Sequence, residues 1–583
     1  MSEGNVPRAR SRRADLVLIG ILSAAWLLPW TLLTGAALVS GGHPVVSPLD
    51  FINPVRLVTI YRADGNAIVW WHLVGAVQPA HLWLFIGFIV LALTALIAVA
   101  AGGLLLWAGG VPGVGASRLL VPGRLQHSSR WATWRDLRPL RVRRPRAGSL
   151  VLGRRGAHLI ATEAETSVLV IGPTRSGKTS GLVVPNLLDW QGPAIVTSTK
   201  NELVELTAAH RRRIGPVSVY DPTGEIGDRA DSVSWSPLAG CEELDVAWTV
   251  AAWLCAGLQQ GGGRGDNDWA HWAESGKLLI APLLYTAASC ERSIVDVRDW
   301  IHGFDLDTPM ALLGRLSEAD CGRDSDPQRA LAMLSSVDQR PDKERGTVFS
   351  TVMRIFSVFN ERAVAASAAT SRFDPERFLS SRGTLYLCTP RQSPERIASL
   401  FVGILMTVVT RGYGLAARQP RGRLQPELGL FLDELANVVP IEELPSLASQ
   451  GAGRGIVLMS IIQDLSQLRA RYGADRANSI LNNHGCKMVL PGISDPETTE
   501  VIARLVGRGQ YTDVQVGHND GRPTRSYSLR QDQMASPDAL RQLPEGTGVV
   551  LYRGKPPTIV RLRPWYADRA LTDLVRGPAG AAG

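Results

Sequence analysis

The stretch Gly172-Pro173-Thr174-Arg175-Ser176-Gly177-Lys178-Thr179 matches the phosphate-binding loop pattern G-x-x-x-x-G-K-[ST] at every fixed position. The apolar run 167–171 before it predicts a strand, and the run 182–188 after it predicts a helix, although Pro185 should kink or shorten that helix. A strand, a glycine loop and a helix N-terminus in this order surround phosphates with backbone N–H groups. The stretch therefore predicts an ATP site, with Lys178 on the β- and γ-phosphates and Thr179 on Mg²⁺.

The use of lysine in this chain supports that interpretation. Of the 62 basic residues only six are lysine, and Lys178 is the first of them along the chain. A sequence that uses arginine almost everywhere has lysine at the position where a compact charge fits and a planar guanidinium does not. A chance match among 58 glycines is the alternative, but the flanking strand and helix disfavour it.

A second stretch, 428–434, is an apolar run that ends in two acidic residues, Asp433 and Glu434. An apolar strand with this ending has the Walker B form, in which Asp433 would hold Mg²⁺ and Glu434 would orient and deprotonate the attacking water. Such an ending is weak by itself, because many strands end in a polar turn. Paired with the phosphate loop, it predicts a hydrolytic site.

Two further polar residues are candidates for that site. Gln463 follows the apolar strand predicted over 456–462, and ligands of doubly wound sheets lie at this carboxyl edge. Gln463 would then sense the γ-phosphate or position water; an amide in an ordinary turn is the alternative. Arg454 precedes the same strand in a glycine-rich stretch, where it could reach the nucleotide of a neighbouring subunit as an arginine finger.

Strands and helices alternate around these motifs, which predicts an α/β fold with a parallel sheet, that of a P-loop NTPase (RecA-like) domain. From about 240 to 360 the strand patterns vanish and only helical periodicity remains, which predicts an all-α insertion. We therefore expect the nucleotide-binding domain in two parts, 151–239 and 361–576, around an insertion at 240–360. Residues 577–583 are expected to form a loose tail.

The N-terminal part has the pattern of a two-helix membrane anchor. Residues 16–39 and 82–107 are uncharged and long enough to cross a bilayer, and a short loop, 40–81, separates them. Basic residues gather before the first span, in 1–15, and after the second, in the Arg-rich stretch 108–150. Basic residues are in excess on the cytoplasmic side of membrane spans, so both ends of this two-helix anchor should face the cytoplasm. We therefore expect the protein in the cytoplasmic (inner) membrane. The Arg-rich stretch would lie against anionic headgroups, with a direct DNA contact as the alternative.

The composition adds little about partners or chemistry. The formal net charge of +9 points weakly to nucleic acid or anionic lipid, and a genome that favours arginine codons would explain it equally well. The six cysteines have no metal-ligand spacing, which suits reduced thiols in a cytosolic part. No Ser-His-Asp or Cys-His arrangement stands out, and we expect His210, His271 and His484 to be structural.

Taken together, these motifs resemble the TraG/TraD-type coupling proteins of type IV secretion and conjugation. The resemblance covers nearly the whole chain and is carried by the phosphate loop and these stretches: Asp221-Pro222, Ser236-Pro237-Leu238, 432–437, Gln463 with Gln467-Leu468, 495–498 and the closing Leu562-Arg563-Pro564-Trp565-Tyr566. It implies a homo-hexameric ring ATPase under a secretion channel, which receives relaxase-bound single-stranded DNA or a protein and drives it toward the channel. The helical insertion would then recognise the substrate. One departure is Ser198-Thr199-Lys200, where many members carry Asp two residues before the lysine, and this leaves the role of Lys200 open.

Two other functions compete with this one. A double-stranded DNA translocase of the chromosome-segregation or mycelial-transfer type shares the motor core, but it usually ends in a winged-helix DNA reader. This chain is expected to have only a short tail after its last predicted strand. A nucleotide-binding membrane scaffold without turnover would not need Glu434 beside Asp433.

Overall fold

The computed structural model of the chain describes residues 129–198, 201–227, 229–256, 266–319, 325–388, 394–519 and 522–577. Both predicted membrane segments, the loop between them, Lys200 and the tail beyond Gly577 lie outside these residues. One described helix, Glu395–Arg418, is long and apolar enough to cross a membrane, but 61% of its most apolar window is buried within the protein.

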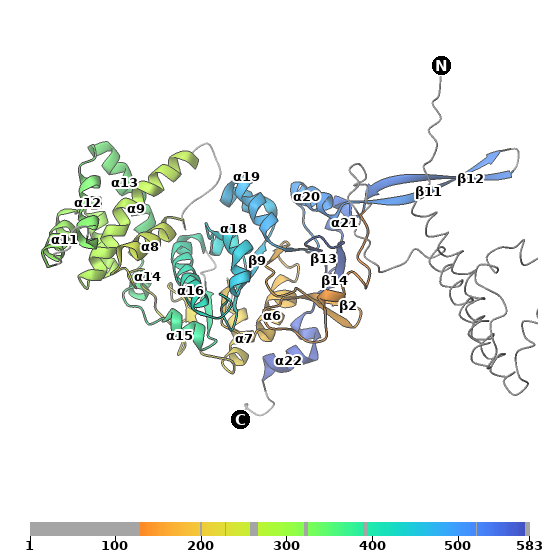
Figure 1. Ribbon diagram of the computed structural model, residues 1–583, viewed down its shortest axis with the longest axis horizontal. Coiled ribbons are helices and arrows are strands. Elements are labelled where there is room, and N and C mark those ends of the chain that lie inside the picture. Colours follow the sequence, from red (N-terminus) through yellow and green to blue (C-terminus); the bar gives the residue numbers. More distant parts are fainter. Residues whose placement is uncertain are drawn as a thin grey trace, which may run out of the picture. The chain divides into compact units, whose positions relative to one another are not determined.

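The described chain is built around a twelve-stranded sheet with the strand order β1-β3-β2-β14-β13-β10-β4-β9-β8-β5-β7-β6. Figure 1 labels β2, β14, β13 and β9 of this sheet. The strands from β10 to β6 run parallel, and the others pair antiparallel. Their bounds are β1 Arg141–Val142, β2 Val151–Arg155, β3 His158–Ala161, β4 Val168–Ile171, β5 Ala194–Ser198, β6 Val217–Tyr220, β7 Thr384–Cys388, β8 Leu428–Leu432, β9 Ile456–Ile462, β10 Cys486–Val489, β13 Thr547–Tyr552 and β14 Thr558–Arg561.

The parallel part of the sheet is buried on both faces. Along β4, Leu169 and Ile171 belong to one apolar cluster, while Val168 and Val170 belong to another. Because successive side chains of a strand point to opposite faces, the two clusters mark the two faces of the sheet. Strands buried on both sides read as continuous apolar runs, which is why the sequence predicted them well. The predicted α/β, P-loop NTPase-like fold is confirmed.

Helices cover both faces. The cluster that contains Val168 includes residues of α6 Val184–Asp189, α7 Glu202–Arg211 and α22 Arg569–Arg576, and the other includes α16 Ala398–Arg418, α17 Leu435–Val438, α19 Leu465–Asn483 and α20 Pro496–Val506. Two short helices, α18 Leu444–Ser446 and α21 Pro537–Arg541, complete this part of the chain. As the sequence predicted, the helix after the phosphate loop is irregular: Thr179–Val183 forms a π turn, and Pro185 lies in the first turn of the short α6. Proline tolerates that place because its missing N–H is not needed there.

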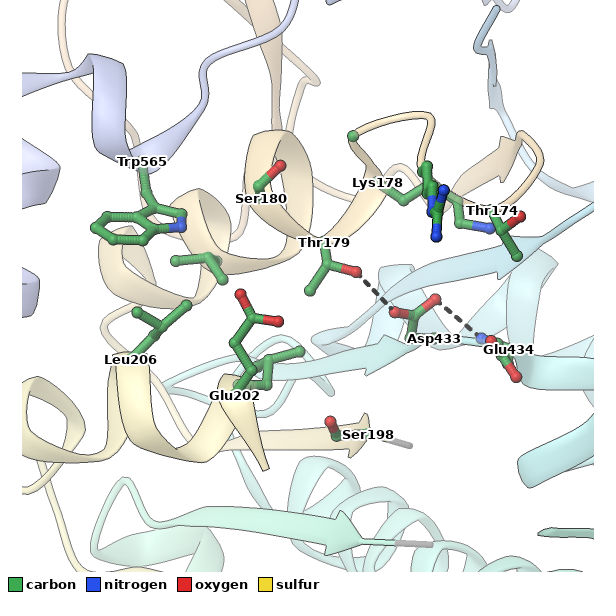
Figure 2. A pocket seen from close by; sticks show the side chains of 14 residues that line it. Thr174, Lys178, Thr179, Ser180, Ser198, Glu202, Leu206, Asp433, Glu434 and Trp565 are labelled. Carbon is green, nitrogen blue, oxygen red and sulfur yellow. Dashed lines mark hydrogen bonds between the residues drawn. The ribbon is translucent and has the colours of Figure 1, made fainter. Parts of the chain in front are cut away.

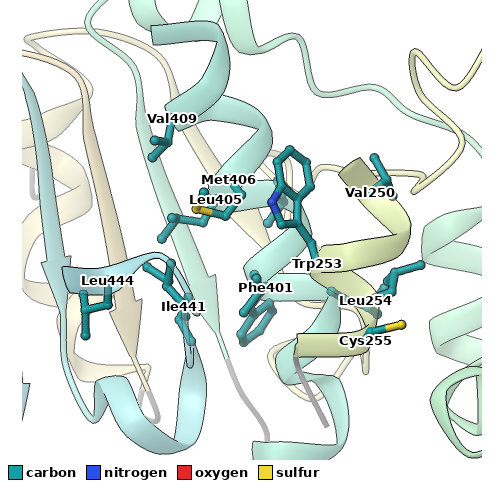
Figure 3. Close-up of a cluster of buried hydrophobic side chains, with 14 of the residues drawn as sticks. Val250, Trp253, Leu254, Cys255, Phe401, Leu405, Met406, Val409, Ile441 and Leu444 are labelled. Atoms are coloured by element: carbon teal, nitrogen blue, oxygen red, sulfur yellow. The ribbon is translucent and has the colours of Figure 1, made fainter. Parts of the chain in front are cut away.

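Between β6 and β7 the described residues form helices and no strand. They are α8 Leu244–Ala256, α9 Asp266–Ser289, α10 Ile294–His302, α11 Asp307–Ala319, α12 Asp326–Asp338, α13 Asp342–Phe356, α14 Arg362–Ala368 and α15 Pro375–Ser380. Helix α9 packs against α8, α12 and α13, and α8 packs against α16. Figure 3 shows Trp253 of α8 beside Phe401 and Met406 of α16, with Ile441 and Leu444 on the other side of α16. Helix α16 thus joins the helical segment to the chain that follows β8.

The antiparallel strands β1, β2 and β3 were not predicted. Residues 129–142 fall in the stretch predicted to be an Arg-rich linker, yet Leu137 and Leu140 are buried and Arg141–Val142 pairs with β3. The arginines concealed the apolar spacing on which this strand depends. A separate hairpin, β11 Arg508–Asn519 and β12 Arg522–Gln533, was also missed because its residues are mostly polar. The dipeptide Asp520-Gly521, which separates the two strands in the sequence, is the signal that could have indicated the hairpin.

Candidate active site

The phosphate loop leaves β4 at the carboxyl edge of the parallel strands. It can adopt its tight path because two positions are glycine. A Cβ placed on Gly172 would lie 2.8 Å from the Cβ of Leu490, and Gly177 has a φ of +85°. Larger residues would clash at the first position and be strained at the second. Arg175 also has a positive φ, of 63°, without being glycine, and such strain is typical of functional loops.

Lys178 lies inside this loop. Its side chain is buried, and Nζ donates a hydrogen bond to the backbone oxygen of Gly172 at 2.7 Å. Burial lowers the pKa of Lys178, and the nearby charges of Asp433 and Glu434 partly oppose that shift. A lysine ammonium at this position in the loop is suited to bind a phosphate that enters the pocket.

Thr179 and Asp433 meet in this site although 254 residues separate them in the chain. The Thr179 Oγ1 hydroxyl donates a hydrogen bond of 3.1 Å to Oδ2 of Asp433. Asp433 directly follows β8, and its backbone oxygen accepts a bond of 2.8 Å from Thr197 Oγ1 on the neighbouring β5. A hydroxyl and a carboxylate held this close supply hard oxygen ligands, so these residues fit Mg²⁺. Within the described residues no cluster of three His, Cys, Asp or Glu side chains could hold a metal alone, and Mg²⁺ at phosphates needs only one or two protein ligands.

Glu434 has a strained backbone. Its φ and ψ are 51° and 42°, in the left-handed region, and its N–H donates to Oδ1 of Asp433 at 3.1 Å. A residue other than glycine in this region costs roughly 1–3 kcal/mol and persists only where the surroundings impose it. The turn brings both carboxylates to one edge of the pocket, next to the phosphate loop.

The pocket joins these groups in one cavity of about 280 Å³ (Figure 2). Its lining includes seven predicted residues: Thr174, Arg175, Gly177, Lys178, Thr179, Asp433 and Glu434. The predicted loop residues Gly172, Pro173 and Ser176 shape the loop without lining the cavity. Sequence reasoning missed seven lining residues: Ser180, Val184, Ser198, Glu202, Leu203, Leu206 and Trp565. None of the seven had been predicted as a site residue, although Trp565 lies in the closing stretch that carries the family resemblance and Ser198 lies at the departure from it.

Two predicted residues lie outside the lining. Gln463 follows β9 at the carboxyl edge, next to the loop, since the Gly172 N–H donates to the Ile462 oxygen at 3.1 Å. The exposed Arg454 stacks over the Tyr413 ring at 5.1 Å and lies at the other end of β9. The seven residues of β9 span about 23 Å, so Arg454 cannot reach the nucleotide site of its own subunit.

Comparison with known proteins shows the family to which this chain belongs. The family model described as Type IV secretory system Conjugative DNA transfer matches residues 124–581. The chain belongs to this coupling-protein family. The resemblance predicted from its motifs is thereby confirmed.

Curated relatives in this family are similar over most of the chain. The conjugal transfer protein TraG of Escherichia coli is 26% identical over 443 residues, which are 68% of this chain and 67% of TraG. The protein VirD4 of Agrobacterium fabrum is 24% identical over 470 residues, 78% of this chain and 68% of VirD4.

Solved structures of the coupling protein TrwB share the fold. TrwB in complex with ADP and Mg²⁺ has a TM-score of 0.55 at 17% identity, over 75% of this chain and 94% of TrwB. Its complex with a non-hydrolysable ATP analogue has a TM-score of 0.53 at 16% identity, with the same coverage. At this identity the likeness concerns the fold alone.

Proposed function

We propose that this chain is the ATP-hydrolysing coupling protein of a type IV secretion or conjugation system. It would receive single-stranded DNA with its bound relaxase, or a protein, and drive it toward the transfer channel. The observation that carries the proposal is the meeting of Thr179 and Asp433 in one pocket with Lys178 and Glu434, in a chain of the conjugative DNA transfer family. The family match favours this function over a double-stranded DNA translocase, and Glu434 beside Asp433 favours it over a scaffold without turnover.

Each residue around the pocket would have a role in hydrolysis. Backbone N–H groups of the loop and the ammonium of Lys178 would bind the β- and γ-phosphates and stabilise the charge that develops on them. Mg²⁺, when bound between Thr179 and Asp433, would supply Lewis-acid neutralisation of phosphate charge. Glu434 would orient the attacking water and accept its proton. Gln463, at the adjacent strand end, would sense whether the γ-phosphate is present.

The helical segment between β6 and β7 would receive the substrate. It would form an all-α insertion, 240–360, within a nucleotide-binding domain made of residues 151–239 and 361–576. Helix α16 supports a coupling role, because its buried side chains contact α8 on one side and the residues after Glu434 on the other. A packed helix transmits displacement because protein interiors are nearly incompressible. Nucleotide turnover at Glu434 would thereby move the receiving helices.

The working assembly would be a membrane-anchored homo-hexamer. Residues 16–39 and 82–107 would form the multi-pass anchor in the cytoplasmic membrane, with the bulk of the chain in the cytoplasm. Arg454 lies too far from its own pocket, so we propose that it completes the site of a neighbouring subunit. Its exposure and its distance from the pocket support that role.

A transfer assay tests the proposed function. Donor cells that lack this protein are complemented with wild type, Lys178→Ala or Lys555→Ala, and DNA transfer to recipients is counted. Lys555 lies in the turn between β13 and β14, outside the pocket, and serves as the matched control. We expect transfer with wild type and Lys555→Ala but none with Lys178→Ala at equal protein levels. Normal transfer with Lys178→Ala would contradict the proposal.

A further inference from the structure

The pocket has a polar end and an apolar end. Thr174, Lys178 and Asp433 line the polar end, whereas Leu206 and Trp565 line the other. Figure 2 shows the Trp565 indole beside Leu206, with Ser180 between them and the phosphate loop. Hydrolysis as described above uses only the polar end, so the apolar end has no role in it.

Trp565 reaches the pocket from the last segment of the chain. It lies in a short 3₁₀ turn, Trp565–Ala567, that follows β14 and precedes α22. This segment is fitted against the phosphate loop itself. A Cβ placed on Gly177 would lie 3.2 Å from Leu562 Cδ1, and one placed on Gly181 would lie 3.1 Å from Leu562 Cβ. The two glycines therefore leave the space that Leu562 fills, three residues before Trp565.

Ion pairs around Arg563 hold the segment that carries Trp565 against α6 and α22. The buried Arg563 guanidinium donates to Asp189 at the end of α6 and to Asp568 before α22, each at 2.5 Å. Asp568 also accepts from Arg154 of β2 at 2.7 Å. Charge-assisted hydrogen bonds between partners this buried are strong and directional. The Trp565 backbone oxygen in turn accepts from Thr572 Oγ1 at 2.9 Å. The segment that carries Trp565 is thus bonded through Arg563 to α6, which continues the helix after the phosphate loop, and through Thr572 to α22.

We propose that this apolar end is a nucleobase subsite, in which the base of the bound nucleotide stacks on the Trp565 indole beside Leu206. The inference rests on the proposed function of the pocket. The order of the lining supports it: phosphates at Thr174–Thr179 would be followed by the ribose near Ser180 and Val184, and then by the base at Trp565. An aromatic face offers stacking to any base, because every base has a π surface. The subsite therefore binds the face of the base without selecting among bases, and it accepts both ATP and GTP.

Calorimetric titration of the full-length protein in detergent, with Mg²⁺ present and with Glu434→Gln in every protein so that the probes are not hydrolysed, tests this subsite. The probes are ATP, GTP and ribose 5′-triphosphate, which keeps the sugar and phosphates but lacks the base. The variants are Trp565→Ala, Trp565→Phe, Lys178→Ala and the control Tyr566→Ala. Tyr566 is 64% exposed and does not line the pocket, but its ring contacts the Trp565 indole edge-on at a centroid distance of 5.8 Å. The Tyr566→Ala variant therefore tests whether loss of a ring beside the subsite is enough to remove the preference.

We expect wild type to bind ATP and GTP about tenfold more tightly than ribose 5′-triphosphate, the order of one stacking interaction. Trp565→Ala should abolish that difference and leave the affinity for ribose 5′-triphosphate unchanged, whereas Trp565→Phe and Tyr566→Ala should retain the difference. Equal binding of ATP and ribose 5′-triphosphate by wild type would overturn the subsite, whether or not the variants fold. The subsite would also be overturned if Trp565→Ala still bound ATP more tightly than ribose 5′-triphosphate, or if it lost affinity for both probes by the same factor.

The Lys178→Ala protein separates this inference from the proposed function. It should bind all three probes weakly, because each of them carries the triphosphate. If Lys178→Ala binds them as wild type does, the phosphate site itself is wrongly placed. If it binds them weakly while Trp565→Ala behaves like wild type, only the base subsite fails.

Discussion

The hydroxyl of Thr179 and the carboxylate of Asp433 are 3.1 Å apart, at the start of the loop helix and the end of β8. The pair marks where Mg²⁺ would bind, because both groups are oxygen ligands, one at the end of the phosphate loop and the other beside it. Removing the hydroxyl should weaken the metal site, while a shorter hydroxyl side chain should preserve it.

Thr179→Ala is therefore expected to lower ATP hydrolysis at least about tenfold, the cost of one strong polar interaction. The Mg²⁺ concentration for half-maximal activity should rise as well, whereas Thr179→Ser should stay close to wild type. Steady-state hydrolysis measured across a Mg²⁺ titration checks this. An unchanged Mg²⁺ dependence in Thr179→Ala would show that the hydroxyl does not contact the metal.

Glu434→Gln should separate binding from chemistry. The amide keeps the size of the side chain but cannot accept a proton from water, so hydrolysis should fall by a factor of at least about 100. ATP binding, measured by calorimetry, should remain.

Glu434→Gly should be equally inactive but no less stable in thermal melting, since glycine adopts the left-handed backbone of this position without strain. Substantial turnover in either variant would remove Glu434 from its proposed role.

His484 makes the stability of the protein depend on pH. Its Nδ1–H donates to the Ile480 backbone oxygen at 2.7 Å, so Nε2 is the nitrogen that accepts from Ser460 Oγ at 2.9 Å. Burial lowers the pKa of His484 to about 4, against 6.5 in the unfolded chain. Between these values the unfolded chain binds more protons, so the free energy of unfolding decreases as the pH falls from about 6.5 to about 4.

The contribution of His484 to that decrease should reach about 3 kcal/mol. His484→Gln cannot titrate, and its melting temperature should fall less than that of wild type between pH 7.5 and pH 5. The comparison cancels the other titrating groups, which both proteins share. Parallel pH profiles would mean that His484 is protonated in the folded protein or already exposed.

Gly403 and Gly414 lie on the same helix, α16, in opposite surroundings. A Cβ on Gly403 would lie 2.4 Å from the buried Trp235 ring, whereas one on Gly414 would have no atom within 4 Å. Gly403→Ala should destabilise the protein by about 1–3 kcal/mol through overpacking. Gly414→Ala should stabilise it by up to about 1 kcal/mol through helix propensity. Thermal melting of the two variants checks the packing of α16, and equal shifts would contradict it.

The parts of the site that the sequence predicted are those that local chemistry dictates. The loop around Lys178 and the acidic pair at 433–434 are short patterns that need specific residues, and their meeting follows from strand order in this type of sheet. Trp565 and Glu202 reach the pocket only through tertiary packing of the last segment and of α7, which no local pattern encodes. The antiparallel strands β1–β3 were missed because each has only two to five residues, too few for a recognisable apolar pattern.

ATP hydrolysis by the full-length protein in detergent tests the central claim most directly. Turnover is compared without DNA, with single-stranded DNA and with duplex DNA, and Lys178→Ala serves as the blank. A coupling protein should hydrolyse ATP faster with single strands than with duplex or no DNA, and the variant should show no turnover under any condition. Stimulation by duplex alone, or turnover that survives in Lys178→Ala, would contradict the account.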